Sequence, residues 1–207
     1  AVGAAFGAGL AWASRKFAVE SDPRIDEVEE FLPGANCGGC GYAGCRGFAE
    51  AVVTLGAPCN GCPVASSEAA SLIASVMGVA VDESADRLVA LVHCGGGNKE
   101  AKDKADYVGI YDCRAAAIVN SGAKGCEYGC LGLASCVKAC LFDAMSMGPN
   151  GLPIVDEDKC TSCGLCVAAC PRALISLVPV SKEVHVLCRS FGRGMEVRNN
   201  CTVGCIG

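Results

Sequence analysis

The chain opens with an apolar stretch that is unlike anything after it. Residues 1–13 are all apolar, and Arg15 and Lys16 follow closely. Small residues recur at four-residue steps, which favours close helix contact in a bilayer. Thirteen residues cannot span, since about 20 are needed. Because the numbering starts within the run, we interpret residues 1–18 as the end of a transmembrane anchor that leaves the rest on the cytoplasmic side. The alternatives are a buried amphipathic helix and the remnant of a signal peptide, which fits poorly because signal peptides carry their charge before the apolar run.

Helical patterns fill the next part of the chain. Ser21 or Asp22 can cap a linker helix within residues 19–33, because Pro23 suits a first helical turn and Leu32-Pro33-Gly34 ends the pattern. Two further helices are predicted over residues 46–55 and 66–77. They belong to a short helical domain at residues 34–80.

Short strand patterns mark the second half. Strands are predicted in residues 85–94, 173–180 and 183–188, and a hairpin is predicted around residues 145–147 and 153–155. The sequence therefore indicates an α+β fold made of small domains. We divide the second half into a connecting α/β segment (81–125), a two-cluster ferredoxin-like domain (126–180) and the start of a further ferredoxin-like module (181–207).

Cysteine content changes this picture most. The 207 residues include 18 cysteines but only two histidines, His93 and His185. The cysteines are grouped at two- and three-residue gaps, which suits metal centres in a reducing compartment better than disulfides. We expect both histidines to be packed or hydrogen-bonded. The net charge of −5 and pI near 5.1 argue against nucleic-acid binding.

The strongest motif is "CTSCGLCVAACP", which has the spacing C-x2-C-x2-C-x3-C-P of bacterial ferredoxins. In such runs three cysteines bind one [4Fe–4S] cluster and the fourth binds a second cluster. An altered copy, "CLGLASCVKACLFDAM", lies upstream, with Leu133 in place of its second cysteine. One cluster is therefore expected at Cys140, Cys160, Cys163 and Cys166.

The other ferredoxin-type cluster lacks an obvious fourth ligand. Cys130, Cys136 and Cys170 are its first three ligands, and Cys126 is the nearest candidate for the fourth. If Cys126 does not reach, this site would be a three-iron cluster.

An internal repeat leaves further cysteines open. Cys113-x12-Cys126-x3-Cys130 recurs as Cys188-x12-Cys201-x3-Cys205. This match of gaps indicates the further module after residue 180. It also leaves two further cysteines, Cys113 and Cys94, as either ligands or small buried residues.

The first cysteine group lies in a glycine-rich loop. "CGGCGYAGC" followed by "CNGCP" gives Cys37, Cys40, Cys45 and Cys62, with Cys59 as an alternative to Cys62. The glycines let a backbone approach an inorganic core closely. Four such cysteines suit zinc or a cluster, and the neighbouring ferredoxin motifs favour a third [4Fe–4S] cluster.

These motifs, in this order, resemble a known family. The stretches "ASRKFAVE", "LPGANCGGCGYAGCRGFAEAV", "GCEYGCLGLASCVKACLFDAM" and "CTSCGLCVAACP" are similar to the B subunit of the Rnf complex across essentially the whole chain. The departures are Cys59, which the first motif does not require, Ala65 where glycine is common, and the end at Gly207.

The resemblance implies an electron-relay subunit of a membrane-bound ferredoxin:NAD oxidoreductase that translocates Na⁺ or H⁺. Its expected cofactors are at least three [4Fe–4S] clusters, and its expected place is the cytoplasmic side of the cell membrane. It implies electron exchange with soluble ferredoxin and with membrane-embedded and flavin-bearing subunits. No catalytic acid, base or nucleophile is expected here. The alternatives are a soluble polyferredoxin-type subunit of a cytosolic redox enzyme and a zinc-binding adaptor.

Overall fold

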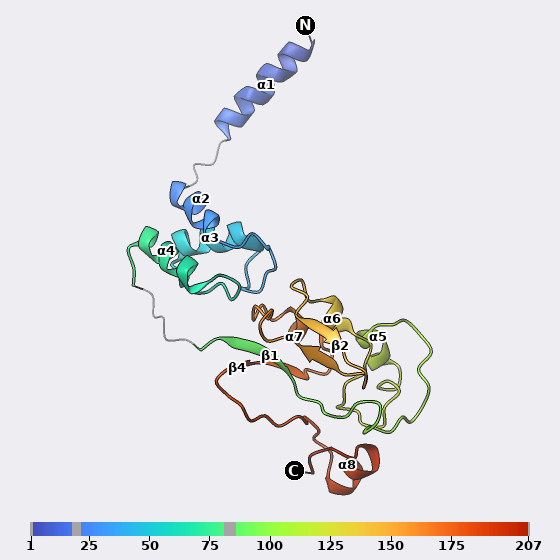
Figure 1. The fold of residues 1–207 in the computed structure, drawn as a ribbon. Coiled ribbons are helices and arrows are strands. Elements are labelled where there is room, and N and C mark those ends of the chain that lie inside the picture. Colours follow the sequence, from blue (N-terminus) through green and yellow to red (C-terminus); the bar gives the residue numbers. More distant parts are fainter. Residues whose placement is uncertain (1, 18–21, 81–85, 207) are drawn as a thin grey trace.

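The computed structural model describes residues 2–17, 22–80 and 86–206. The described chain falls into a separate helix at residues 2–16, a helical part at residues 23–77, and a mixed part with short strands (Figure 1). In chain order the elements are α1 (Val2–Lys16), α2 (Pro23–Glu30), α3 (Gly44–Leu55), α4 (Ser67–Met77), β1 (Leu88–Val92), α5 (Cys113–Ile118), α6 (Ser135–Lys138), β2 (Met145–Met147), β3 (Pro153–Val155), α7 (Leu165–Ala169), β4 (Ile175–Pro179) and α8 (Gly194–Asn200).

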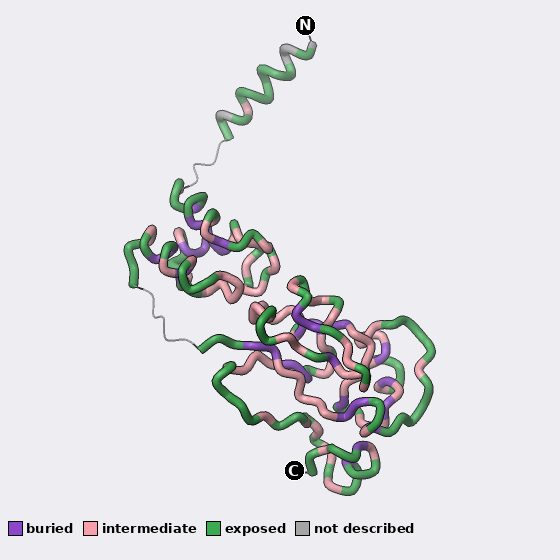
Figure 2. Tube along the Cα trace, viewed as in Figure 1, coloured by how far each residue is buried: buried purple, intermediate pink, exposed green. Residues whose placement is uncertain are grey.

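Helix α1 stands away from the other elements (Figure 1), and its described residues are exposed apart from Ala13, which is intermediate (Figure 2). The side chains of Phe6, Leu10 and Trp12 are 71%, 70% and 61% exposed. The ammonium of Lys16 lies 4.9 Å from the centre of the Trp12 ring. Among the described residues, no helix has the length and apolar character needed to cross a bilayer. The anchor at residues 1–18 therefore stays a prediction.

Helix α2 begins at one of its two predicted caps. The side chain of Asp22 accepts a hydrogen bond from the amide of Arg24, and Pro23 lies in the first turn. Ser21, the other candidate cap, lies outside the described residues. The two helices predicted after it are also confirmed, because α3 ends at Leu55 as expected and Ser66 caps α4.

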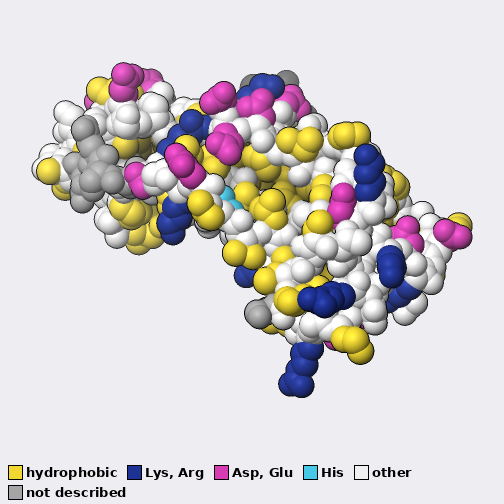
Figure 3. Space-filling view, turned by 60° about the horizontal axis from the view of Figure 1, so that its bottom comes forward, with side chains coloured by type: hydrophobic (Ala, Val, Ile, Leu, Met, Phe, Trp, Pro, Cys, Tyr) yellow, Lys and Arg dark blue, Asp and Glu magenta, His cyan; other side chains and the backbone are white. Residues whose placement is uncertain are grey.

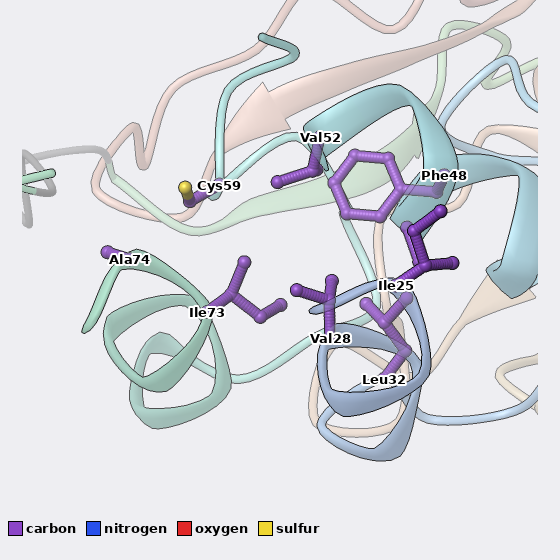
Figure 4. Close-up of a cluster of buried hydrophobic side chains, with 9 residues drawn as sticks. Ile25, Val28, Leu32, Phe48, Val52, Cys59, Ile73 and Ala74 are labelled. Atoms are coloured by element: carbon purple, nitrogen blue, oxygen red, sulfur yellow. The ribbon is translucent and has the colours of Figure 1, made fainter. Parts of the chain in front are cut away.

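The three helices enclose one small hydrophobic core (Figure 4). Val28 from α2, Phe48 and Val52 from α3, and Ile73 from α4 are each no more than 1% exposed. Burial of side chains of this size stabilises a fold by about 1.5–3 kcal/mol each. This core supports the glycine-rich loop that precedes α3.

Two short antiparallel sheets organise the mixed part. Strand β1 pairs with β4, with Val92 opposite Ile175, and β2 pairs with β3 as the predicted hairpin, with Met145 opposite Val155. The predicted strands in residues 85–94 and 173–180 are thus confirmed. Helices α6 and α7 pack beside these sheets over a core that includes Met145 and Ile175.

The predicted strand at residues 183–188 is wrong. This segment runs as irregular chain, and only an isolated bridge pairs Cys188 with Cys94. A second bridge pairs Cys201, just after α8, with Ala101. The segment after β4 therefore lies against residues 93–101. It leaves apolar side chains such as Val184 and Phe191 exposed, and Figure 3 shows hydrophobic side chains spread across one face of the molecule.

Candidate metal centres

Four cavities of the described chain are each lined by four cysteines. All 18 cysteines are free thiols. We number the cavities by their cysteines: the first has Cys37, Cys40, Cys45 and Cys62; the second has Cys140, Cys160, Cys163 and Cys166; the third has Cys113, Cys130, Cys136 and Cys170; the fourth has Cys94, Cys126, Cys188 and Cys201.

The first cavity lies between the glycine-rich loop and the start of α3. Gly38 and Gly41 have φ angles of +70° and +86°, which glycine adopts without a Cβ penalty. The side-chain oxygen of Asn36 accepts a hydrogen bond from the amide of Cys45 at 2.8 Å, so the loop folds back onto the helix. This geometry brings together all four cysteines that the sequence grouped here.

Cys62, and not Cys59, lines this cavity. Cys59 is 8% exposed and belongs to the hydrophobic core of the helical part. Burial raises the pKa of the Cys62 thiol, and the nearby thiols of Cys40 and Cys45 act in the same direction. Cys62 therefore shares one site with the two earlier cysteines.

The second cavity combines both ferredoxin-type runs. Cys160, Cys163 and Cys166 come from the downstream run, and Cys140 comes from the upstream run. Burial is the main cause that raises the pKa of the Cys166 thiol to about 11, and the charges of Cys163 and Cys160 raise it further. The amide of Ala90 in β1 points at the sulfur of Cys160 at 3.5 Å. The two runs thus cross over at this cavity in the way that the sequence predicts.

The first and second cavities meet at one glycine. A Cβ atom on Gly39 would lie 2.6 Å from the carbonyl oxygen of Cys163, which is closer than real Cβ atoms come. The loop of the first cavity therefore rests directly on the loop of the second.

The third cavity differs from the sequence prediction at one corner. Cys130, Cys136 and Cys170 lie together as expected, but Cys113 completes the group and Cys126 does not line it. Burial raises the pKa of the Cys136 thiol to about 12, and the charges of Cys130, Cys113 and Cys170 add to the rise. Burial also raises the pKa of Cys130 to about 11, although the positive charge of Lys124 opposes it.

A hydrogen-bonded clip explains why Cys113 reaches this corner. The amide of Cys113 donates to the hydroxyl of Ser135 at 2.8 Å, and that hydroxyl donates to the carboxylate of Asp112 at 3.0 Å. Asp112 also caps α5, and the hydrogen bond from Ser135 is the largest cause that lowers its pKa. Because Ser135 precedes Cys136, the clip joins the start of α5 to the third cavity.

Cys126 points instead to the fourth cavity. Burial raises the pKa of its thiol, and the charges of Cys94 and Cys201 act in the same direction. Cys94, Cys188 and Cys201 lie outside the ligand set predicted from the sequence. The signal that could have found them is the repeated gap of twelve residues, which by itself indicates only the start of another module.

His93 lies at the edge of the fourth cavity, but its ring is held by hydrogen bonds. Both ring nitrogens of His93 have hydrogen-bond partners, the carbonyl of Val186 at 3.1 Å and the hydroxyl of Ser176 at 2.6 Å. Within the described residues, no three His, Cys, Asp or Glu side chains converge as the ligands of a single ion would. Four cysteines around each cavity match the donor set of a [4Fe–4S] cluster.

Two family matches cover the cysteine-rich stretches. Residues 32–64 match the family described as "Putative Fe-S cluster" and contain the first cavity's cysteines. Residues 153–176 match the "4Fe-4S binding domain" family and contain the downstream ferredoxin-type run. Iron–sulfur domains are therefore present in both the helical and the mixed part.

Three curated relatives match nearly the whole chain. The B subunit of the Na(+)-translocating ferredoxin:NAD(+) oxidoreductase complex of Acetobacterium woodii is 47% identical over 98% of this chain, which spans 61% of that protein. The B subunit of the ion-translocating oxidoreductase complex of Methanosarcina acetivorans is 48% identical over 100% of this chain and 78% of its own length. The B subunit of the proton-translocating ferredoxin:NAD(+) oxidoreductase complex of Clostridium ljungdahlii is 46% identical over 99% of this chain and 72% of its own. The chain belongs to the family of B subunits of ion-translocating oxidoreductase complexes.

Proposed function

We propose that this chain is the iron–sulfur electron relay of an ion-translocating ferredoxin:NAD oxidoreductase. The observation that carries the proposal is the contact of Gly39 with Cys163, which places two four-cysteine cavities against each other. The names of the Acetobacterium and Clostridium relatives supply the reaction of the complex. A chain of adjacent metal centres suits electron transfer and has no evident use in a structural zinc adaptor.

The cysteines of the first three cavities would hold the clusters. When bound, a [4Fe–4S] cluster stores and passes single electrons. The chain's own part is to supply thiolates, exclude water and direct amides at the sulfurs, which tunes cluster potential. The amide of Leu174 donates to the sulfur of Cys170 at 3.4 Å, as that of Ala90 does to Cys160. We propose Cys113 in place of Cys126 as the fourth ligand of the third cavity.

Membrane attachment through α1 is part of the proposal. The helix presents large apolar side chains to its surroundings, and Lys16 at its end stacks over Trp12. Tryptophan and lysine are common where a helix leaves a bilayer. The cytoplasmic side follows from the same charge pattern. The other subunits of the complex and soluble ferredoxin are the proposed partners.

Reduction by ferredoxin tests the relay. A chemically reduced two-cluster ferredoxin, mixed anaerobically with the iron-loaded full chain, should bleach the chain's visible absorbance. Gly39→Ala should keep the iron content but slow the later phase of bleaching, because the first and second cavities are forced apart. Gly47→Ala is the control, since its Cβ meets only ordinary contacts. A wild-type chain that ferredoxin does not bleach would refute the relay.

Fractionation separates the membrane relay from the soluble alternative. The natural full-length protein should pellet with membranes and need detergent for extraction. If it stays in the soluble fraction, the polyferredoxin-type role replaces the membrane relay.

A further inference from the structure

The fourth cavity collects cysteines from three distant parts of the chain. Cys94 follows β1, Cys126 lies ahead of the upstream ferredoxin-type run, and Cys188 and Cys201 flank α8. Its volume is about 40 Å³, against about 20, 20 and 10 Å³ for the second, third and first cavities. It is thus at least as roomy as the cavities that the sequence assigned to clusters.

Backbone pairing holds three of these four cysteines, Cys94, Cys188 and Cys201, in place. The isolated bridges pair Cys94 with Cys188 and Ala101 with Cys201. The amide of Gly95 donates to the carbonyl of Leu187 at 2.8 Å beside the first bridge. Beside the second, the amide of Lys102 donates to the carbonyl of Asn200 at 2.9 Å. The cysteines therefore meet through built contacts between segments almost a hundred residues apart.

Gly96 brings bare backbone against two of the sulfurs. A Cβ atom on Gly96 would lie 2.9 Å from the sulfur of Cys201 and 4.0 Å from that of Cys94. Glycine loops of this kind allow the backbone to approach an inorganic core. Residues 93–96 thus form one wall of the cavity.

The buried ammonium of Lys124 lies beside the wall that Gly96 forms. Lys124 is 5% exposed, and its ammonium donates to the carbonyl of Gly96 at 2.9 Å. The ion pairs among the described residues do not include it. An ammonium buried without a counter-ion is costly. Iron-bound thiolates in the third and fourth cavities would supply the missing negative charge.

We propose that Cys94, Cys126, Cys188 and Cys201 bind a further [4Fe–4S] cluster. The inference rests on the proposed function for the kind of metal. The site would continue the row of centres, because the amide of Cys130 in the third cavity donates to the sulfur of Cys94 at 3.4 Å. Cys59 in the core and the exposed Cys205 line none of the four cavities.

Iron and sulfide counts on the anaerobically purified full chain test this site. The wild type should hold about 16 irons and 16 sulfides, and Cys188→Ser about 12 of each. Cys205→Ser is the matched control and should equal the wild type. Cys188→Ser should keep the EPR signals of the other centres. Equal iron in Cys188→Ser and the wild type, or zinc that only the wild type holds, would overturn the fourth cluster.

The same iron counts distinguish failure of the fourth cluster from failure of the proposed function. About 12 irons in the wild type would remove only the fourth cluster, whereas a chain without iron would remove both proposals. Thiol labelling of the wild-type holoprotein tests the site without a variant, so misfolding of a variant cannot affect the result. Iodoacetamide should modify Cys205 at once but spare Cys126 and Cys188 until the iron is chelated. Labelling of those two at the rate of Cys205, or a disulfide between Cys94 and Cys188, would overturn the site.

Discussion

The first and the fourth cavity each gather four cysteines, but the chain builds them over very different spans. The first takes its cysteines from residues 37–62, and the fourth takes them from residues 94–201. The first cavity rests on the hydrophobic core around Phe48. The fourth cavity has two buried apolar residues in its lining, Ala101 and Val197. The fold around the first cavity is therefore stabilised by its own hydrophobic core, whereas the fold around the fourth cavity depends on the metal bound there.

The largest expected effect is therefore unfolding of the segment after β4 when the metal is removed. Structural metal binding contributes on the order of 10 kcal/mol in small domains. After iron chelation, trypsin should cut rapidly at Arg189 and Arg193, while Arg46, paired with Asp26 and Glu29, stays protected by the α2–α4 core. Equal cutting at Arg46 and Arg189 would mean that the two regions do not differ in this way.

A core substitution should produce the opposite pattern. Phe48 is 1% exposed, and Phe48→Ala should lower the free energy of unfolding of the helical part by about 3–5 kcal/mol, through lost burial and a cavity. Denaturant titration followed by far-UV circular dichroism measures this. The EPR signals of the second and third cavities should persist. Loss of every signal would show that the parts fold as one unit.

The buried charge of Lys124 should influence the potentials of the third and fourth centres. Lys124→Gln removes a buried positive charge between the third and fourth cavities. Reduction adds negative charge, so the midpoint potentials there should fall by some tens of millivolts, roughly 1–2 kcal/mol at an effective dielectric near 20. Redox titration with EPR measures the shift. Lys182→Gln, at an exposed position, is the control, and potentials unchanged in Lys124→Gln would contradict the placement of the charge.

The smallest effect is expected at the clip that holds Cys113. Ser135→Ala removes the acceptor of the Cys113 amide and the donor to Asp112, at a cost of about 1 kcal/mol. The EPR signal of the third centre should broaden while the second centre is unchanged. If a Cys113→Ser variant kept an intact third centre, Cys126 and not Cys113 would be the fourth ligand of that centre.

The same clip gives a pH dependence of known sign. Its hydrogen bonds lower the pKa of Asp112 from its ordinary value, so the clip stabilises the chain above that value and loses this contribution as the pH falls through the lowered pKa. Ser135→Ala should weaken this acid sensitivity. Urea titrations at neutral and acidic pH measure it.

Local patterns predicted most of the local structure. The Asp22 cap, the hairpin at residues 145–147 and 153–155, and the first cavity all depend on residues near one another in sequence. The four cysteines of the fourth cavity could not be grouped from local sequence patterns. Pairing of β1 with β4 carries the chain onward to set Cys94 opposite Cys188, and no local periodicity records that register. The repeated Cys-x12-Cys-x3-Cys spacing is visible in the sequence but suggests a separate module.

Native mass spectrometry of the anaerobic full chain shows whether these cysteines hold iron–sulfur clusters. The holoprotein should be heavier than the polypeptide by four [4Fe–4S] units, about 16 irons and 16 sulfides, which are lost in steps of one cluster on gentle activation. A mass equal to the polypeptide less the hydrogens of paired disulfides, or increased only by single zinc ions, would contradict it.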